Sequence, residues 1–226
     1  MDQPAPITIN AVVVEFLREQ EQRLSAKRLS KYRQVLDLFR IYLDGYWPGE
    51  PQEEYDRVTK LGGTYATWFG PEQILDGYPE FFGYYMGHKV YGSLETKRAA
   101  GAVMKRFAEW LSEKKYVERA EEAVLRSKRA STELPAAEQA CRVLEQSLHK
   151  GQPTETAAII EDHFTITRIE AGRIWLTPLT ETATVVGPIT VPKKATALLQ
   201  VNWDISGAVE KTSRGWCLAE IWNVTP

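Results

Sequence analysis

The side chains that could do chemistry in this sequence are mainly cations, and they fall in two segments. The first segment holds Lys27, Arg28, Lys31 and Arg33. In the second, Arg98 and Lys105 would lie within roughly 20° of one another on a helix. Clustered Lys and Arg side chains are typical contacts to nucleic-acid phosphates. The alternative is an ordinary solvated surface, because Glu109 follows Lys105 by one helical turn and can form an ion pair with it.

Patterns for catalysis or metal binding are few. The triplet Glu161-Asp162-His163 is the only acid-and-imidazole run. Alternate residues of a strand share a face, so Glu161 and His163 would point the same way without a third metal ligand. The sequence has neither a glycine-rich phosphate loop nor a serine nucleophile elbow. We therefore expect no enzyme activity, no metal and no cofactor.

The charge of the chain is balanced overall. Its 226 residues are 43% hydrophobic, which allows a sizeable buried core, and the formal net charge is -2. Residues 1–130 hold 20 basic and 19 acidic side chains, and residues 131–226 hold 8 and 11. No global positive field would attract nucleic acid, so a nucleic-acid site would depend on local patches.

The cysteines and the N-terminal residues indicate the compartment. Cys141 and Cys217 form neither a metal-ligand motif nor a redox pair. The first residues lack a basic region, and no apolar run is long enough for a signal core or a membrane span. We therefore expect a cytoplasmic protein in a reducing setting, without membrane contact.

Apolar spacing predicts three main helices in the first half. Asn10 is expected to cap one helix and Ser25 a second, which would stop at a left-handed Gly45. The apolar stripe of the second helix is Leu29, Tyr32, Leu36, Phe39 and Leu43. Ser93 is expected to begin the third, over residues 93–111. The stripe that this third helix would turn to the core is Ala100, Val103, Phe107, Trp110 and Leu111.

The segment before the third helix is rich in aromatic residues. We expect a long connection over residues 46–65, with one helical turn around residues 53–58, and short helices at 71–76 and 79–85, each beginning at a proline. The aromatic set is Tyr78, Phe81, Phe82, Tyr84 and Tyr85. We expect it to form a core ridge facing the third helix; the alternative is a platform on which nucleic-acid bases stack.

The period of the sequence changes in the second half. Helices are expected at 117–131 and 135–149, with Pro135 starting the second and Gly151-Gln152-Pro153 ending it. Strands are then expected at 164–169 and 174–176, joined by a tight turn at Gly172, and at 183–186, 189–191, 201–209 and 216–224. One helical turn is expected within 193–199. Short strands with Gly and Pro at their corners favour a small closed or nearly closed barrel. Its core and one exposed groove would share Trp175, Trp203, Trp216 and Trp222.

Residues 15–43 and 94–117 together resemble the core-binding, SAM-like helical domain of tyrosine recombinases (phage integrases). The resemblance implies a helical bundle that clamps DNA. The DNA-facing set that it implies is Lys27, Arg28, Lys31, Arg33, Thr96, Lys97, Arg98 and Lys105. The family's catalytic His-x-x-Arg motif is absent, because the residues three after the histidines are Tyr91, Gln152 and Ile166. Strand cleavage is therefore not expected.

The sequence predicts an α+β protein with three parts. These are an N-terminal all-α helical bundle over residues 1–130, a helical connector over 131–153, and a small β-barrel over 154–226 that looks SH3-like. The predicted function is that of a non-catalytic DNA-binding or DNA-associated accessory protein whose barrel binds a partner. The alternative is a protein–protein interaction or scaffold module without nucleic-acid binding, in which Trp203 and Trp222 grip the partner.

Overall fold

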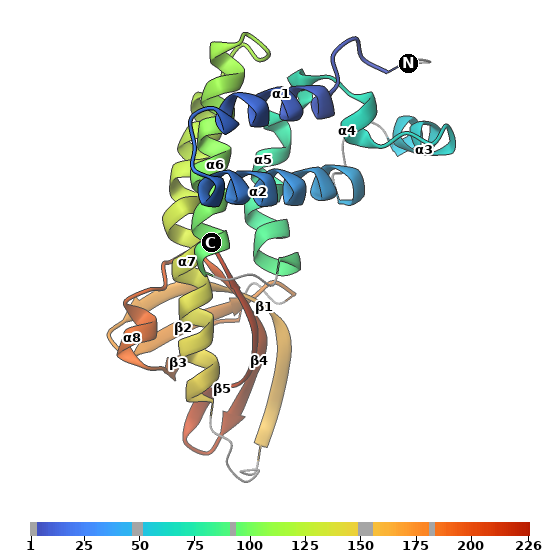
Figure 1. Ribbon diagram of the computed structural model, residues 1–226. Coiled ribbons are helices and arrows are strands. Elements are labelled where there is room, and N and C mark those ends of the chain that lie inside the picture. Colours follow the sequence, from blue (N-terminus) through green and yellow to red (C-terminus); the bar gives the residue numbers. More distant parts are fainter. Residues whose placement is uncertain (1–3, 47–51, 91–93, 149–155, 181–183) are drawn as a thin grey trace. The chain divides into compact units, whose positions relative to one another are not determined.

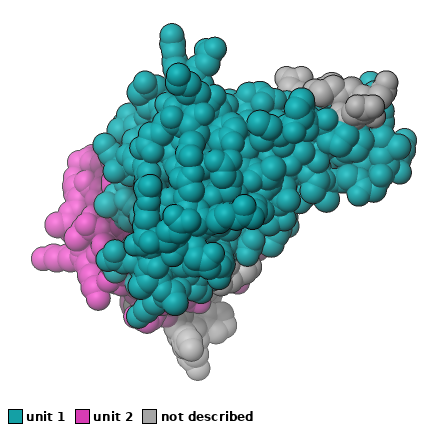
Figure 2. Space-filling view, turned by 45° about the horizontal axis from the view of Figure 1, so that its top comes forward, with its two compact units in different colours: residues 1–132 teal, residues 133–226 magenta. Residues whose placement is uncertain are grey.

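Helices occupy the first part of the chain and strands the last (Figure 1). The computed structural model describes residues 4–46, 52–90, 94–148, 156–180 and 184–226. The chain forms two compact units, residues 1–132 (unit 1) and residues 133–226 (unit 2), which Figure 2 colours separately. The predicted α+β class, with helices followed by a sheet, is confirmed. Residues 133–148 of the expected connector belong to unit 2.

Unit 1 is built from α-helices and a run of shorter turns. Its α-helices are α1 (Ile9–Glu21), α2 (Ala26–Gly45), α3 (Gln52–Lys60), α4 (Tyr65–Trp68), α5 (Tyr78–Glu80), α6 (Leu94–Glu113) and the first part of α7 (Glu121–Ser147). The cap of α1 is Thr8, whose hydroxyl accepts a hydrogen bond from the Ala11 N–H at 3.2 Å, so the expected Asn10 cap was wrong. Gly45 lies inside α2 with no left-handed backbone, which corrects the expected stop. Ser93 and residues 151–153 lie outside the described residues.

The core of unit 1 is largely aromatic. The expected stripe of α6 is buried along its whole length. Phe16 of α1 packs on that stripe, with ring centroids 5.0 Å from Phe107 and 5.2 Å from Trp110. The buried Tyr78 hydroxyl donates to the Met104 carbonyl of α6 at 3.0 Å. Of the predicted ridge, Tyr78 contacts α6. Phe81 and Tyr85 instead pack on Phe39 and Tyr42 of α2, and Tyr84 is partly exposed to solvent.

Residues 71–90 differ from the expected pair of short helices. They form two 3₁₀ turns, η1 (Pro71–Gln73) and η2 (Leu75–Gly77), then α5 and the π-helix η3 (Phe81–Lys89). The Val90 N–H donates to the Tyr85 carbonyl at 3.2 Å, a span of five residues instead of four. This wider spacing brings residues four and five apart onto the same face.

Helix α7 corrects the expectation of two helices divided at Pro135. Pro135 lies inside one continuous helix, although a proline removes one backbone hydrogen bond there. Buried side chains continue on both sides of it, at Ala130 in unit 1 and at Ala137, Ala140 and Leu144 in unit 2. Burial of this stripe offsets the lost bond, so the helix does not stop.

Unit 2 is an antiparallel sheet with the second part of α7 in its core. The described strands are β1 (Thr156–Glu170), β2 (Arg173–Pro178), β3 (Val186–Thr190), β4 (Asp204–Thr212) and β5 (Gly215–Thr225), and α8 (Lys193–Thr196) is one helical turn. They pair in the order β3-β2-β1-β4-β5. Figure 1 shows this sheet curled as a half-barrel, and α7 residues 137–144 share its apolar core. The expected tight turn at Gly172 is present, with φ +82°.

The expected closed or nearly closed barrel forms only in part. Its edge strands β3 and β5 lie near one another in space, but no hydrogen-bonded ladder joins them among the described residues. The two strands expected at 183–186 and 189–191 are one strand, β3, although residue 183 lies outside the described residues. An SH3-like identity stays a prediction.

Candidate nucleic-acid interface

The predicted cations of α2 lie on its first two turns and are largely solvent-accessible. Lys27 and Arg28 are exposed. Lys31 is half-buried and forms an ion pair with Glu95 of α6. Arg33 is exposed and pairs with Glu21 of α1 at 3.1 Å. Of these four predicted cations, two are therefore already engaged by carboxylates.

The predicted residues of α6 divide into three environments. Arg98 is exposed, and Thr96 is half-buried. Lys105 pairs with Glu109 at 3.4 Å, which agrees with the alternative of an ordinary solvated surface. Lys97 is only 3% exposed, so the structure places it in the interior of unit 1 and not among the DNA-facing side chains.

Lys31 and Glu95 hold the starts of α2 and α6 side by side. The hydrogen bond and the charge of Lys31 lower the pKa of Glu95, and the charge of Lys27 acts in the same direction. Arg98 follows Glu95 by three residues, which is one turn further along the same side of α6. Lys27 and Lys31 of α2 therefore act on one carboxylate of α6, and Arg98 lies one helical turn beyond it.

Tyr32 connects the next part of this surface. Burial raises the pKa of its phenol, and the nearby charges of Arg106 and Arg28 oppose that shift. Arg28 of α2 and Arg106 of α6 thus lie close to the same ring. We define the cationic face as Lys27, Arg28, Lys31, Arg98, Lys105 and Arg106.

Carboxylates are interspersed with the cationic face. Arg106 donates two hydrogen bonds to Glu113, at 2.8 and 3.1 Å, and these bonds raise the pKa of its guanidinium. Within the part of the chain that the structure describes, Lys27, Arg28 and Arg98 form no ion pair. The sequence did not reveal the role of Glu95, because that residue is 64 positions from Lys31. The cationic face therefore combines cations without an ion pair with cations that carboxylates neutralise.

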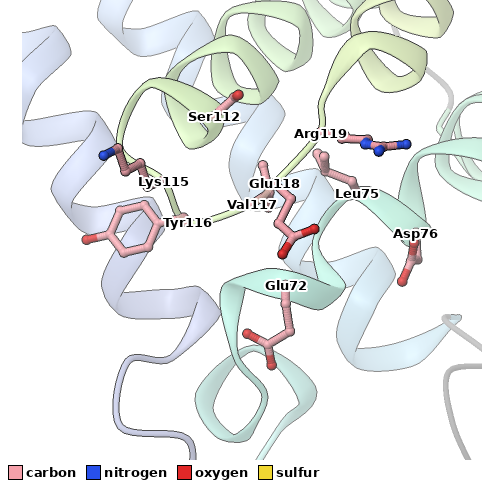
Figure 3. A pocket seen from close by; sticks show the side chains of 9 residues that line it. All are labelled: Glu72, Leu75, Asp76, Ser112, Lys115, Tyr116, Val117, Glu118 and Arg119. Atoms are coloured by element: carbon pink, nitrogen blue, oxygen red, sulfur yellow. The ribbon is translucent and has the colours of Figure 1, made fainter.

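A cleft of about 700 Å³ lies elsewhere in unit 1 (Figure 3). Residues 72–76 form one wall, and residues 112–119, which run from the end of α6 into the following segment, form the other. Its charged lining residues are Glu72, Asp76, Lys115, Glu118 and Arg119. These side chains are exposed and of both signs, so the cleft selects no ligand by charge. Nothing in the spacing of the sequence pointed to it.

The two tryptophans predicted to bind a partner have opposite environments. Trp203 is 5% exposed and belongs to the apolar core of unit 2, which removes it from any surface. Trp222 of β5 is 52% exposed, and its indole N–H donates to Glu220 at 2.9 Å. Only Trp222 is therefore accessible to a partner.

The triplet Glu161-Asp162-His163 serves the fold of the sheet. Burial raises the pKa of Asp162, but hydrogen bonds from Thr180 and from the backbone of His163 outweigh burial and lower it overall. His163 Nδ1 lies 2.6 Å from Ser206 Oγ, and Ser206 is 4% exposed. Among the described residues, no three His, Cys, Asp or Glu side chains are grouped as a metal site requires.

No protein-family model matches the chain, and no curated protein or solved structure was found to be similar to it. In the described ranges, no helix combines the length and the apolar character needed to cross a membrane.

Proposed function

We propose that the chain is a non-catalytic DNA-binding protein whose cationic face contacts the phosphates of a duplex. One observation carries the proposal: Lys27 and Arg28 of α2 and Arg98 of α6 are exposed around a junction that Lys31 and Glu95 hold together. Two helices thereby present cations on adjoining surfaces. Residues 15–43 and 94–117 resemble a domain that clamps DNA, and this resemblance supports DNA as the ligand.

The proposed contact is electrostatic and independent of base sequence. Cations that neutralise phosphates release counterions, so the affinity falls as salt rises. Glu95 and Glu109 lie on the same face and would repel the phosphates. We therefore expect modest affinity for a duplex of any sequence, strongest at low salt.

Neutralising the two exposed cations of α2 tests the proposal. The variant K27Q/R28Q is compared with K193Q/K194Q, which removes two exposed lysines from α8 of unit 2. Fluorescence anisotropy with a labelled 20-base-pair duplex at 50 mM salt gives the affinity. We expect K27Q/R28Q to bind at least about fivefold more weakly than the wild type and K193Q/K194Q to bind like it. Equal binding by both variants, or no binding by the wild type, would sink the proposal.

The second candidate function is a protein-interaction module, and the exposed Trp222 favours it. A tryptophan exposed on a sheet is a residue type that often anchors protein interfaces. If this second function is the correct one, K27Q/R28Q retains every partner that chemical crosslinking recovers, and Trp222→Ala loses one of them. The reverse pattern supports the DNA contact.

A further inference from the structure

A second surface of unit 1 is aromatic instead of cationic. Tyr84 of η3 is 41% exposed and Tyr46, which follows α2, is 46% exposed, whereas Phe81, Phe82 and Tyr85 of the same region are buried. The Lys89 ammonium lies 5.6 Å from the Tyr84 ring centroid and 5.8 Å from that of Tyr46. The two exposed rings therefore flank one cation.

The π-helical geometry of η3 produces this arrangement. Residues four and five positions after Tyr84 lie on its own face of the helix, and these are His88 and Lys89. The imidazole of His88 stacks on the Tyr84 ring, with centroids 4.9 Å apart and planes 24° apart. In an α-helix Lys89 would be turned away from Tyr84. The platform thus depends on the wider helix.

The charge of the segment selects the kind of ligand. Residues 81–89 contain no acidic side chain, and they carry Lys89 beside His88. Aromatic rings next to cations suit a nucleic-acid single strand, because unpaired bases stack on the rings and phosphates pair with the cations. The stem of Lys89 is flexible, so its ammonium can leave a ring face to a base and turn to a phosphate.

We propose that Tyr84, Tyr46, His88 and Lys89 form a stacking platform for unpaired bases of a nucleic-acid strand. The inference goes beyond the proposed function, because it adds single-stranded nucleic acid as a ligand. The platform and the cationic face are separate sites, because Tyr46 follows the last turn of α2 and Lys27 lies in its first turn, about 30 Å apart along the helix.

Variants of Tyr84 separate stacking from simple hydrophobic contact. Tyr84→Phe keeps an aromatic ring without the hydroxyl, and Tyr84→Leu keeps apolar volume without the ring. The probe is a fluorescein-labelled dT 20-mer at 50 mM salt, with Leu179→Ala as a control that removes an exposed apolar side chain from unit 2. We expect Tyr84→Leu to weaken binding at least about fivefold, while Tyr84→Phe and Leu179→Ala bind like the wild type. A matching rU 20-mer shows which sugar is preferred, and dependence on Tyr84 with either strand supports the platform.

The same variants with the 20-base-pair duplex distinguish the two proposals. If dT binding depends on Tyr84 and no duplex is bound, the platform is supported and the proposed duplex contact is wrong. Duplex binding that depends on Lys27 and Arg28, together with dT binding that is absent or equal in Tyr84→Leu, overturns the platform alone. Because Tyr84 is exposed, its truncation leaves the core intact, and circular dichroism verifies the fold of each variant.

Discussion

The ion pair between Lys31 and Glu95 joins two helices across the proposed DNA contact. The Glu95 carboxylate repels a phosphate, and it also competes with the phosphate for the Lys31 ammonium. Exposed ion pairs contribute little to stability, so the pair can be removed without unfolding the protein. The residue that limits the affinity of this face is therefore acidic.

Glu95→Gln is expected to tighten duplex binding by roughly two- to tenfold at 50 mM salt, because it releases Lys31 and removes one negative charge. The measurement is the same anisotropy titration. Glu122→Gln is the matched control, since Glu122 forms an exposed ion pair with Arg126 on α7 and its loss changes the net charge equally. Equal tightening by both variants would assign the effect to net charge alone and contradict the local role of Glu95.

The surroundings of Cys217 lower the reactivity of its thiol. Burial, followed by the hydrogen bond to Glu210 and the charge of that residue, raises the pKa of its thiol to about 11. In a Cys141→Ala background we expect alkylation by iodoacetamide at pH 8 to be at least about tenfold slower than in the urea-unfolded chain. Glu210→Gln should accelerate it. A folded rate equal to the unfolded rate would show that the thiol is not protected.

At the residue scale, helical spacing alone predicts that Lys97 is buried, whereas the resemblance placed it among the DNA-facing residues. Lys97 precedes Ala100 by three residues, on the same stripe as the buried Met104 and Phe107. The periodicity that predicted the core of α6 therefore also places Lys97 in the interior. Glu95, in contrast, could not be assigned as the counter-charge of Lys31, because their contact depends on how α2 and α6 pack.

Helices α6 and α7 approach one another closely at Gly101. A Cβ added there would lie 2.6 Å from the Ser127 carbonyl oxygen and would also meet the backbone nitrogen of Ser131. Backbone atoms of a helix cannot yield as a flexible side chain can. The packing of the two helices in unit 1 therefore requires glycine at this position.

Gly101→Ala is expected to destabilise the protein by about 1–3 kcal/mol, the usual cost of overpacking a core. Gly45→Ala is the control, because Gly45 is also helical and a Cβ there meets nothing within 4 Å. The control should gain roughly 0.4–1 kcal/mol. Urea unfolding measures both, and a Gly101→Ala variant as stable as the wild type would contradict this close approach.

A polar cluster ties α1 to the end of α6. Glu19 accepts a hydrogen bond from the Trp110 indole at 2.9 Å and pairs with Lys114, and the Tyr116 hydroxyl donates to Glu15 at 2.6 Å. Hydrogen bonds from Lys114 and then Trp110 lower the pKa of Glu19. The stabilisation from a lowered carboxyl pKa is present above the unfolded-state pKa and is lost as pH falls through the folded-state pKa.

Glu19→Gln is therefore expected to lower the unfolding temperature at pH 7, and the difference from the wild type should shrink below about pH 4. Thermal unfolding followed by circular dichroism at several pH values measures this. Glu122→Gln, which alters only an intrahelical pair, serves as the control. A difference that stays constant down to pH 3 would contradict the assigned role of the Glu19 carboxylate.

At the element scale, periodicity located most helices and strands because one face of each is buried. It missed the π-helix, since the Tyr84 face depends on hydrogen bonds that span five residues. It also divided α7 at Pro135, because propensity alone disfavours proline in a helix. Burial of Ala137, Ala140 and Leu144 in the sheet core outweighs that preference, and this packing is not visible in local sequence.

The whole chain combines a helical unit with a curled sheet, and the sequence predicted that order from its change of period. The sequence could not show how nearly the sheet closes. The edge strands β3 and β5 lie near one another in space, yet no hydrogen-bonded ladder joins them among the described residues. With a net charge of -2, the proposed DNA contact depends on a local face and not on the field of the molecule.

The salt dependence of duplex binding tests the central claim most directly. If Lys27, Arg28 and Arg98 contact phosphates, the logarithm of the binding constant should fall with the logarithm of salt with a slope of about -3. K27Q/R28Q should make the slope shallower by about 2, and K193Q/K194Q should leave it unchanged. A wild-type slope near zero, or one that K27Q/R28Q does not alter, would contradict the cationic face as the DNA contact.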